Sequence, residues 1–177
     1  MICSQPAAIA NGPITWEPHI NSENNILRWW HRLSAVPAGS ILFSLLLGWF
    51  APYSGTIRSR VEVLEPGCVR VSLRDRRRVR NHLKSIHAIA LINLGEIATG
   101  LALLTTLPAN MRGIVLGLKA EYHKKARGKL TARASFELPA ISGDKTKCQV
   151  GAEIVDEAGD VVATIHVNWL IGFKSNL

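Results

Sequence analysis

The chain has 177 residues, of which 47% are hydrophobic and 19% are charged, and its formal net charge is +8. This length and hydrophobic fraction predict one folded domain and exclude a wholly disordered chain. The basic balance favours a partner that carries negative charge, such as a phosphate-bearing small molecule. Nucleic acid is not expected, because the basic residues belong to no DNA-binding motif and have no aromatic residues interleaved among them.

Residues 1–22 are predicted to form an irregular amino-terminal extension, since prolines and a glycine interrupt them. No basic stretch followed by an apolar core opens the chain, so we expect no secretory signal and a cytoplasmic protein. The longest apolar stretch, from Ile41 to Pro52, is shorter than the roughly 20 residues that span a bilayer. The cysteines show no CxxC spacing, so no metal site is predicted.

Two helices are predicted between residues 23 and 50. The first places four apolar residues on one face at helical spacing and ends before Pro37: Ile26, Trp29, Trp30 and Leu33. The second begins near Ser40, and we expect its buried side to consist of five residues: Ile41, Leu42, Leu45, Leu46 and Trp49. Both helices must dock on the remainder of the chain, so they are assigned to a single domain of residues 23–177.

Apolar and polar residues alternate from residue 57 onward, which is typical of half-buried strands. The alternation predicts a hairpin over 57–74 and four later strands over 114–123, 130–137, 148–154 and 161–169. Between them, a helix over 86–104 with Ser85 as its cap is apolar on nearly every side and should be buried on every side. The expected fold class is therefore α+β, with an antiparallel sheet wrapped around one long central helix and with short amino-terminal helices.

Glu96 is the lone carboxylate of the predicted central helix. Apolar surroundings disfavour a charged carboxylate and raise its pKa towards neutrality, as a general acid or base requires. The alternative is that Glu96 reaches solvent or pairs with an arginine such as Arg80. Gly95 and Gly100 flank it and indicate either a close approach by another backbone or a ligand, or plain helix–sheet packing.

The first amides of this helix, at Ile86, His87 and Ala88, should lack intrahelical partners and lie at the positive end of the helix dipole. Such amides can hold a developing oxyanion. An apolar cleft that contains these donors and a carboxylate suits attack on an acyl carbonyl. His82 and His87 stay ambiguous, because a histidine beside a helix start is often structural.

The segment from Asn81 to Glu96 resembles the signature of hotdog-fold acyl-CoA thioesterases, most closely the phenylacetate-pathway type. That signature has an asparagine, a His-Gly-Gly helix start six residues later, and an acid nine residues after the histidine. Asn81, His87 and Glu96 match it without a gap, and Ala88-Ile89 stands in place of Gly-Gly. The acid is Glu rather than the Asp of that type. The resemblance extends over about residues 25–172 and implies a hotdog fold.

The resemblance also implies roles for residues. Glu96 would attack the thioester carbonyl or activate water against it, and Asn81 would orient the carbonyl or the water. The amide of Ala88 would form the oxyanion hole, while His87 would shape the start of the helix. The implied substrate is an acyl-CoA or an acyl-carrier thioester, with no cofactor beyond the coenzyme A of the substrate. The implied assembly is a homodimer or a tetramer with its site between subunits.

A basic run ends beside the proposed site, and four of its residues are candidates for binding the phosphates of coenzyme A: Arg76, Arg77, Arg78 and Arg80. The alternative for this run is a solvated loop. Two other functions remain open. One is a non-catalytic binder of acyl-CoA or fatty-acyl ligands. The other is a hotdog acyl dehydratase, since His82 precedes Glu96 by fourteen residues, although the proline-rich loop of those enzymes is missing.

Overall fold

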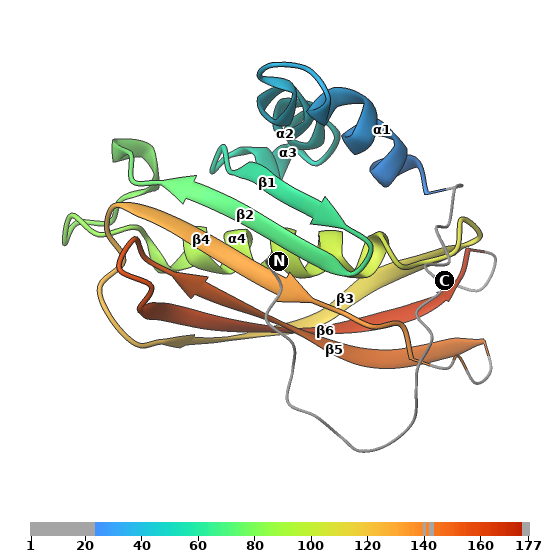
Figure 1. Ribbon diagram of the computed structural model, residues 1–177. Coiled ribbons are helices and arrows are strands. Elements are labelled where there is room, and N and C mark those ends of the chain that lie inside the picture. The colour runs from blue at the N-terminus through green and yellow to red at the C-terminus, as the bar shows by residue number, and fades with distance from the viewer. Residues whose placement is uncertain (1–23, 140, 142–143, 175–177) are drawn as a thin grey trace, which may run out of the picture.

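A computed structural model describes residues 24–139, 141 and 144–174. The predicted extension over residues 1–22 lies outside the described residues. The architecture is an antiparallel sheet curved around one long helix, with three short helices beside the first strand (Figure 1). This arrangement confirms the α+β prediction. No helix in the described ranges is both long enough and apolar enough to cross a membrane.

The sheet has six strands in the order β1-β2-β4-β5-β6-β3, and all neighbouring strands are antiparallel. The strand bounds are β1 Arg60–Glu65, β2 Cys68–Arg74, β3 Met111–Tyr122, β4 Lys129–Ser135, β5 Lys145–Val155 and β6 Val161–Phe173. Gly67 turns the chain between β1 and β2 with φ of 70°, and a Cβ there would lie 2.2 Å from the carbonyl oxygen of Phe136. The turn therefore requires glycine.

The central helix α4, Ala88–Leu104, lies against the concave face of this sheet (Figure 1). Leu94, Ala98, Ala102 and Leu103 have no exposed surface. Burying a leucine fully stabilises the fold by about 1.5–3 kcal/mol relative to exposure, so this helix anchors the core. The helix begins two residues later than predicted: its N-cap is His87, not Ser85.

The amino-terminal helices are α1 Asn25–Ser34, α2 Gly39–Phe50 and α3 Pro52–Gly55. The sequence prediction for the buried side of α2 is wrong. Phe43 and Gly39 are its buried residues, and Phe43 packs edge-on against Trp30 of α1 with ring centroids 5.1 Å apart. The five residues predicted to be buried are all exposed: Ile41, Leu42, Leu45, Leu46 and Trp49. Helical spacing places them opposite the face that meets α1 and β1.

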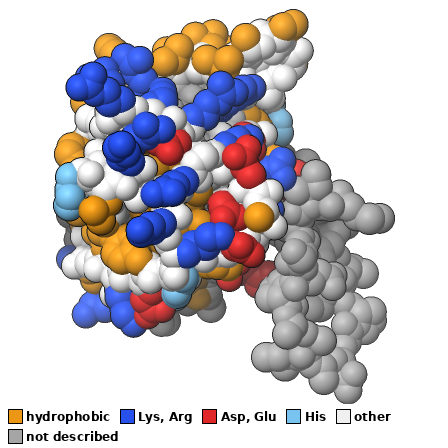
Figure 2. Space-filling view, turned by 90° about the vertical axis from the view of Figure 1, so that its left-hand side faces the viewer, with side chains coloured by type: hydrophobic (Ala, Val, Ile, Leu, Met, Phe, Trp, Pro, Cys, Tyr) orange, Lys and Arg blue, Asp and Glu red, His pale blue; other side chains and the backbone are white. Residues whose placement is uncertain are grey.

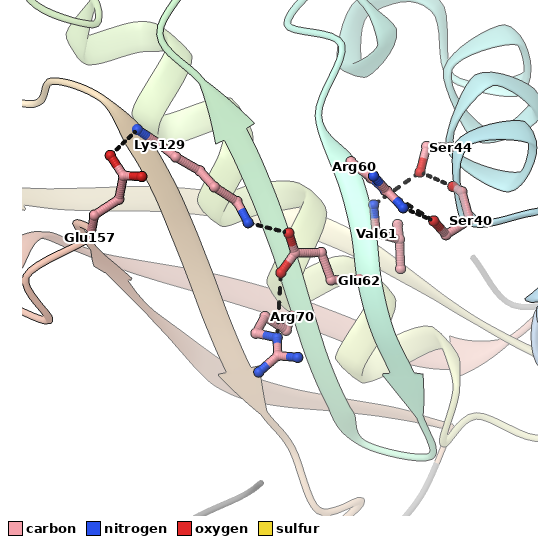
Figure 3. Close-up of polar contacts among 8 residues, drawn as sticks. All are labelled: Ser40, Ser44, Arg60, Val61, Glu62, Arg70, Lys129 and Glu157. Carbon is pink, nitrogen blue, oxygen red and sulfur yellow. Dashed lines mark hydrogen bonds and ion pairs between the residues drawn. The ribbon is translucent and has the colours of Figure 1, made fainter. Parts of the chain in front are cut away.

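Polar contacts fix α2 to the edge strand β1 (Figure 3). The hydroxyl of Ser44 accepts a hydrogen bond from the Val61 amide at 2.9 Å and donates to the Ser40 carbonyl at 2.7 Å. Arg60 donates from Nε and from its terminal nitrogen to the Ser40 hydroxyl at 3.0 and 2.8 Å. The helix thus supplies a partner for a strand amide that would otherwise face solvent at the sheet edge.

The opposite edge of the sheet is β3, which pairs only with β6 among the described strands. Four large apolar or aromatic side chains of this strand are exposed: Ile114, Leu116, Leu118 and Tyr122. A long apolar edge strand presents unpaired backbone groups and is a template for pairing with another chain.

Candidate functional site

Asn81 organises the loop that leads into α4. Its side-chain oxygen accepts hydrogen bonds from the backbone amides of Leu83 at 2.9 Å and Ser85 at 3.1 Å. The backbone amide of Asn81 donates to the Ser85 carbonyl at 2.8 Å. Lys84 completes this tight loop with φ of 56°. Because the side-chain oxygen is already engaged, only the NH₂ group of Asn81 can act on a ligand.

His87 caps the helix with its side chain. Its Nδ1 accepts a hydrogen bond from the Ile89 amide at 3.1 Å, and its backbone is extended, with ψ of 140°. An amide can donate only to an unprotonated ring nitrogen, so the proton of the neutral ring lies on Nε2. The histidine therefore caps the first turn of the helix.

The helix start leaves one amide without an acceptor in the described part of the chain, that of Ala88. The amide of Ile86 donates to the Ala126 carbonyl at 2.8 Å, and that of His87 donates to the Val79 carbonyl at 2.7 Å. The Ile89 amide is held by His87. Of the three amides that the sequence suggested as oxyanion donors, those of Ile86 and His87 thus donate to backbone carbonyls. The Ala88 amide is left without an acceptor among the described residues.

Glu96 lies two turns along α4 and is half-buried. Burial raises the pKa of its carboxyl group, and no other group contributes to the shift. Its carboxylate forms no hydrogen bond or ion pair with any residue that the structure describes. The alternative pairing with Arg80 does not occur, because Arg80 donates to Asp75 at 2.6 Å.

One stripe of α4 is left partly uncovered by the sheet, and it contains Ala88, Ile89, Ile92 and Glu96. The spacing of three and four residues puts them on the same helix face. Gly95 lies elsewhere: a Cβ there would lie 2.5 Å from Cγ1 of Ile165 on β6. That glycine serves helix–sheet packing rather than a ligand.

A small cavity of about 180 Å³ lies beside the start of α4. Its lining comes from α3 and the residues just after it, from η1 (Arg77–Val79) and Arg80, and from the start of α4 with its N-cap. It includes Thr56, Arg78, His87 and Asn93. The side-chain NH₂ of Asn93 donates to the Tyr53 carbonyl at 3.3 Å, while its buried oxygen has no hydrogen-bond partner among the described residues. Asn93 was noted in the sequence only as one of the few polar residues of the helix.

Tyr122 also reaches the helix start. Its hydroxyl donates a long hydrogen bond, 3.4 Å, to the Ala88 carbonyl, and burial raises the pKa of the phenol. The hydroxyl therefore stays protonated at neutral pH. The sequence pattern placed Tyr122 merely on the apolar face of a strand, and no local signal connects it with a helix 34 residues away.

A larger groove of about 800 Å³ lies between α2–α3 and the outer surface of β1–β2. Six cationic side chains line it: Arg58, Arg60, Arg74, Arg76, Arg78 and Lys129. Its carboxylate, Glu62, is held by Lys129 at 2.7 Å and by Arg70 at 3.5 Å (Figure 3). Most of the groove charge therefore has no acidic partner in the described ranges.

The four predicted phosphate-binding arginines separate in the structure. Arg76 and Arg78 line the groove, Arg78 and Arg80 line the small cavity, and Arg77 lines neither. Arg76 is partly occupied, because its terminal nitrogen donates to the carbonyls of Ile57 at 2.6 Å and Arg58 at 2.9 Å. Arg78 is exposed and borders both hollows.

No group of three or more histidine, cysteine, aspartate or glutamate side chains in the described ranges lies close enough to hold a metal ion. The helix start instead gathers hydrogen-bond donors, and the carboxylate of Glu96 lies two turns farther along α4. This set can polarise a carbonyl and supply a nucleophile or a base.

Residues 39–171 match the profile of a family described as a domain of unknown function, DUF4442. The structural-genomics protein APC5556 is 28% identical, with a TM-score of 0.71, and the match covers 84% of this chain and 98% of that chain. A protein of unknown function from Pseudomonas aeruginosa, described as a probable thioesterase, is 26% identical with a TM-score of 0.66, covering 78% and 97%.

The phenylacetic acid degradation protein PaaI from Thermus thermophilus, solved as a variant, is 22% identical with a TM-score of 0.57, and the match covers 67% of this chain and 97% of that chain. At this identity the likeness concerns the fold alone. No functionally curated protein matches the sequence. Together, these structures confirm the hotdog fold and the resemblance to its thioesterase superfamily.

Proposed function

This chain belongs to the DUF4442 family, and we propose that it hydrolyses acyl thioesters, with Glu96 as the nucleophile or the general base. The observation that carries the proposal is the environment of Glu96: a half-buried carboxylate on the central helix with a raised pKa and no partner among the described residues. A carboxylate that stabilised the fold would be expected to have a cation or a donor beside it.

The chemistry follows two routes. As a general base, Glu96 takes a proton from a water whose oxygen attacks the thioester carbonyl carbon. The carbon–sulfur bond then breaks, and the thiolate leaves and recovers the proton from Glu96. As a nucleophile, a Glu96 oxygen attacks the carbonyl carbon and expels the thiolate, and water hydrolyses the resulting anhydride. A raised pKa favours the base route because it strengthens Glu96 as a base near neutral pH.

Both routes put negative charge on the carbonyl oxygen, and the Ala88 amide is the donor that supports this step. Its N–H has no acceptor in the described chain and lies at the positive end of the helix dipole. The NH₂ group of Asn81 is assigned the orientation of the carbonyl or the water. His87 holds the first turn in shape through its bond to the Ile89 amide.

The catalytic unit is proposed to be a homodimer, with a tetramer as the larger alternative. Ala88 and Glu96 are eight residues apart on one helix, which is about 12 Å along the axis. A carbonyl oxygen and its carbon cannot lie within bonding distance of both groups of one chain. Two copies joined along β3 would bring the Ala88 of one to the Glu96 of the other, and the exposed apolar residues of that edge support this pairing.

The acyl carrier is proposed to be coenzyme A or an acyl carrier protein, and the arginines next to the site support a phosphate-bearing carrier. Arg78 is the strongest candidate because it borders the helix-start cavity. The unpaired oxygen of Asn93 in that cavity can accept a hydrogen bond from an amide of the carrier arm. No cofactor other than the coenzyme A of the substrate is required.

The test is Glu96→Gln assayed on a panel of acyl-CoA thioesters, with the release of free thiol as the readout. Glutamine keeps the size and polarity of the side chain but can neither attack nor accept the proton, so kcat should fall by about 10²-fold or more. Activity within a few-fold of wild type would reject the assignment. A wild-type protein that binds acyl-CoA and hydrolyses none of the panel would instead favour the non-catalytic acyl-ligand binder.

A further inference from the structure

The exposed side of the amino-terminal helices forms an apolar crest, defined by six residues: Leu42, Leu45, Leu46, Trp49, Phe50 and Tyr53. Trp49 and Phe50 are 81% and 85% exposed. Exposed hydrophobic residues scattered singly are ordinary, but a contiguous set of this kind marks an interaction surface. The crest follows one side of α2 at helical spacing and continues into α3.

The basic groove directly adjoins this crest. Trp49 and Leu45 line the groove together with arginines such as Arg58 and Arg74. Figure 2 shows Lys and Arg side chains spread over one face, with hydrophobic side chains gathered at its top edge, on the side where Figure 1 places α1–α3. An apolar ridge is therefore bordered by concentrated positive charge.

The arginines of the groove repel one another. Burial, and then repulsion by Arg58, Arg74 and Arg78, lowers the pKa of the Arg76 guanidinium. Glu62 does not relieve this repulsion, since Lys129 and Arg70 hold it. An external anion would relieve this repulsion, because a phosphate placed among these side chains attracts each of them.

We propose that the apolar crest and the basic groove together dock this protein on the surface of an anionic lipid bilayer. Tryptophan, tyrosine and phenylalanine prefer the boundary between headgroups and acyl chains, so the crest would insert there. The arginines would meet the lipid phosphates. With 12 residues, α2 is about 18 Å long, too short to span a hydrocarbon core of about 30 Å, so the contact is peripheral.

Charge favours a bilayer over a second copy of the chain as the occupant. If two crests met, the arginine-rich grooves beside them would approach each other, and their like charges would oppose the contact. An anionic bilayer complements both features, because it offers apolar depth below a plane of phosphates. This docking does not depend on the hydrolysis proposed above.

The experiment is co-sedimentation of the full chain with vesicles of phosphatidylcholine alone or of phosphatidylcholine and phosphatidylglycerol in a three-to-one ratio. Wild type should bind the anionic vesicles, bind the neutral ones far less, and dissociate as salt screens the arginines. A Trp49→Ser/Phe50→Ser variant should lose about tenfold or more of this affinity at an unchanged Tm, because both side chains are exposed.

The charge contribution is measured with Arg58→Gln/Arg74→Gln, which should weaken anionic binding by about 30-fold, about fivefold for each cation. Its matched control is Lys145→Gln/Lys147→Gln, which makes the same change in net charge. Those lysines lie at the start of β5. Arg74 pairs with the start of β4, and that part of β4 pairs with the end of β5. The two lysines therefore lie at the opposite end of β5 from the arginine groove. The control should bind like wild type.

Four outcomes would overturn the proposal. The first is wild type that does not bind anionic vesicles. The second is binding that the crest variant retains, or that the lysine control loses as strongly as the arginine variant. The third is a crest variant that changes the oligomeric state in light scattering without any vesicle binding, which would assign the crest to contacts between copies. Binding of inorganic pyrophosphate without vesicle binding would likewise assign the groove to a small anion.

Discussion

Replacing Ala88 with proline removes one N–H group from the helix start and little else. Ala88 is the first residue of α4, and its amide has no acceptor among the described residues. Proline is favoured at this helix position because its fixed φ suits the helix and its missing N–H would be unpaired in any case. His87, with ψ of 140°, already has the extended backbone that a residue before proline adopts.

The expected effect on stability is therefore small or favourable. A proline that fits the native backbone stabilises a protein by about 0.4–1 kcal/mol because it restricts the unfolded chain. For a domain of this size that corresponds to a rise in Tm of up to about 4 °C. The expected effect on catalysis is large, since loss of one oxyanion donor costs about 10²–10³ in kcat, or about 2.7–4 kcal/mol.

The assay compares kcat on an acyl-CoA thioester and Tm for wild type, Ala88→Pro and Ala88→Ser. The serine variant keeps the amide and should stay within a few-fold of wild type. A proline variant that melts no lower than wild type and keeps its kcat within a few-fold would refute the assignment of the Ala88 amide as the oxyanion donor. A proline variant that unfolds would show that the Ala88 amide or its backbone geometry is needed by the fold.

If Ala88 of one chain and Glu96 of the other form each site, co-expression of Ala88→Pro and Glu96→Gln chains should recover about a quarter of wild-type activity. Half of the dimers would contain one chain of each variant, and one of the two sites in such a dimer would be intact. No recovery of activity would place both groups in one chain. Leu116→Lys/Leu118→Lys on the exposed β3 edge should convert the proposed dimer to monomers in light scattering and abolish activity. An unchanged mass would place the interface elsewhere. Burial raises the pKa of Glu96, so the contribution of its carboxyl group to stability is present below the unfolded-state pKa and is lost as pH rises through the folded-state pKa. Glu96→Gln should therefore have a higher Tm than wild type at neutral pH and the same Tm in acid. A variant that is less stable than wild type at neutral pH would show that the charged carboxylate has a stabilising partner.

Residue patterns predicted those features of this protein that depend on composition along one element. A helix that is apolar on nearly every side has to be buried, and α4 is. Alternating strands before and after it need a common apolar partner, which fixes an antiparallel sheet around that helix. A single acid in such a helix lies among apolar neighbours, so the sequence alone predicted the direction in which the pKa of Glu96 shifts.

Hydrogen-bond partners were decided only by tertiary structure. Three amides at the helix start are equivalent in sequence, but two of them donate to the carbonyls of Ala126 and Val79. Only the Ala88 amide is left without an acceptor among the described residues. Arg76 was a candidate for substrate phosphates, yet carbonyls of residues about 18 positions earlier hold its terminal nitrogen. A local pattern contains no information about which distant carbonyl arrives next to a donor.

The burial of α2 shows the same limit for packing. Its residues are apolar on all sides, as those of α4 are, and the pattern led to the wrong buried face. The sheet surrounds α4, whereas α2 lies outside the sheet at the β1 edge and meets neighbours on one side only (Figure 1). Hydrophobicity sets how much a helix gains from burial, but the number of elements that reach it sets how much of it is buried.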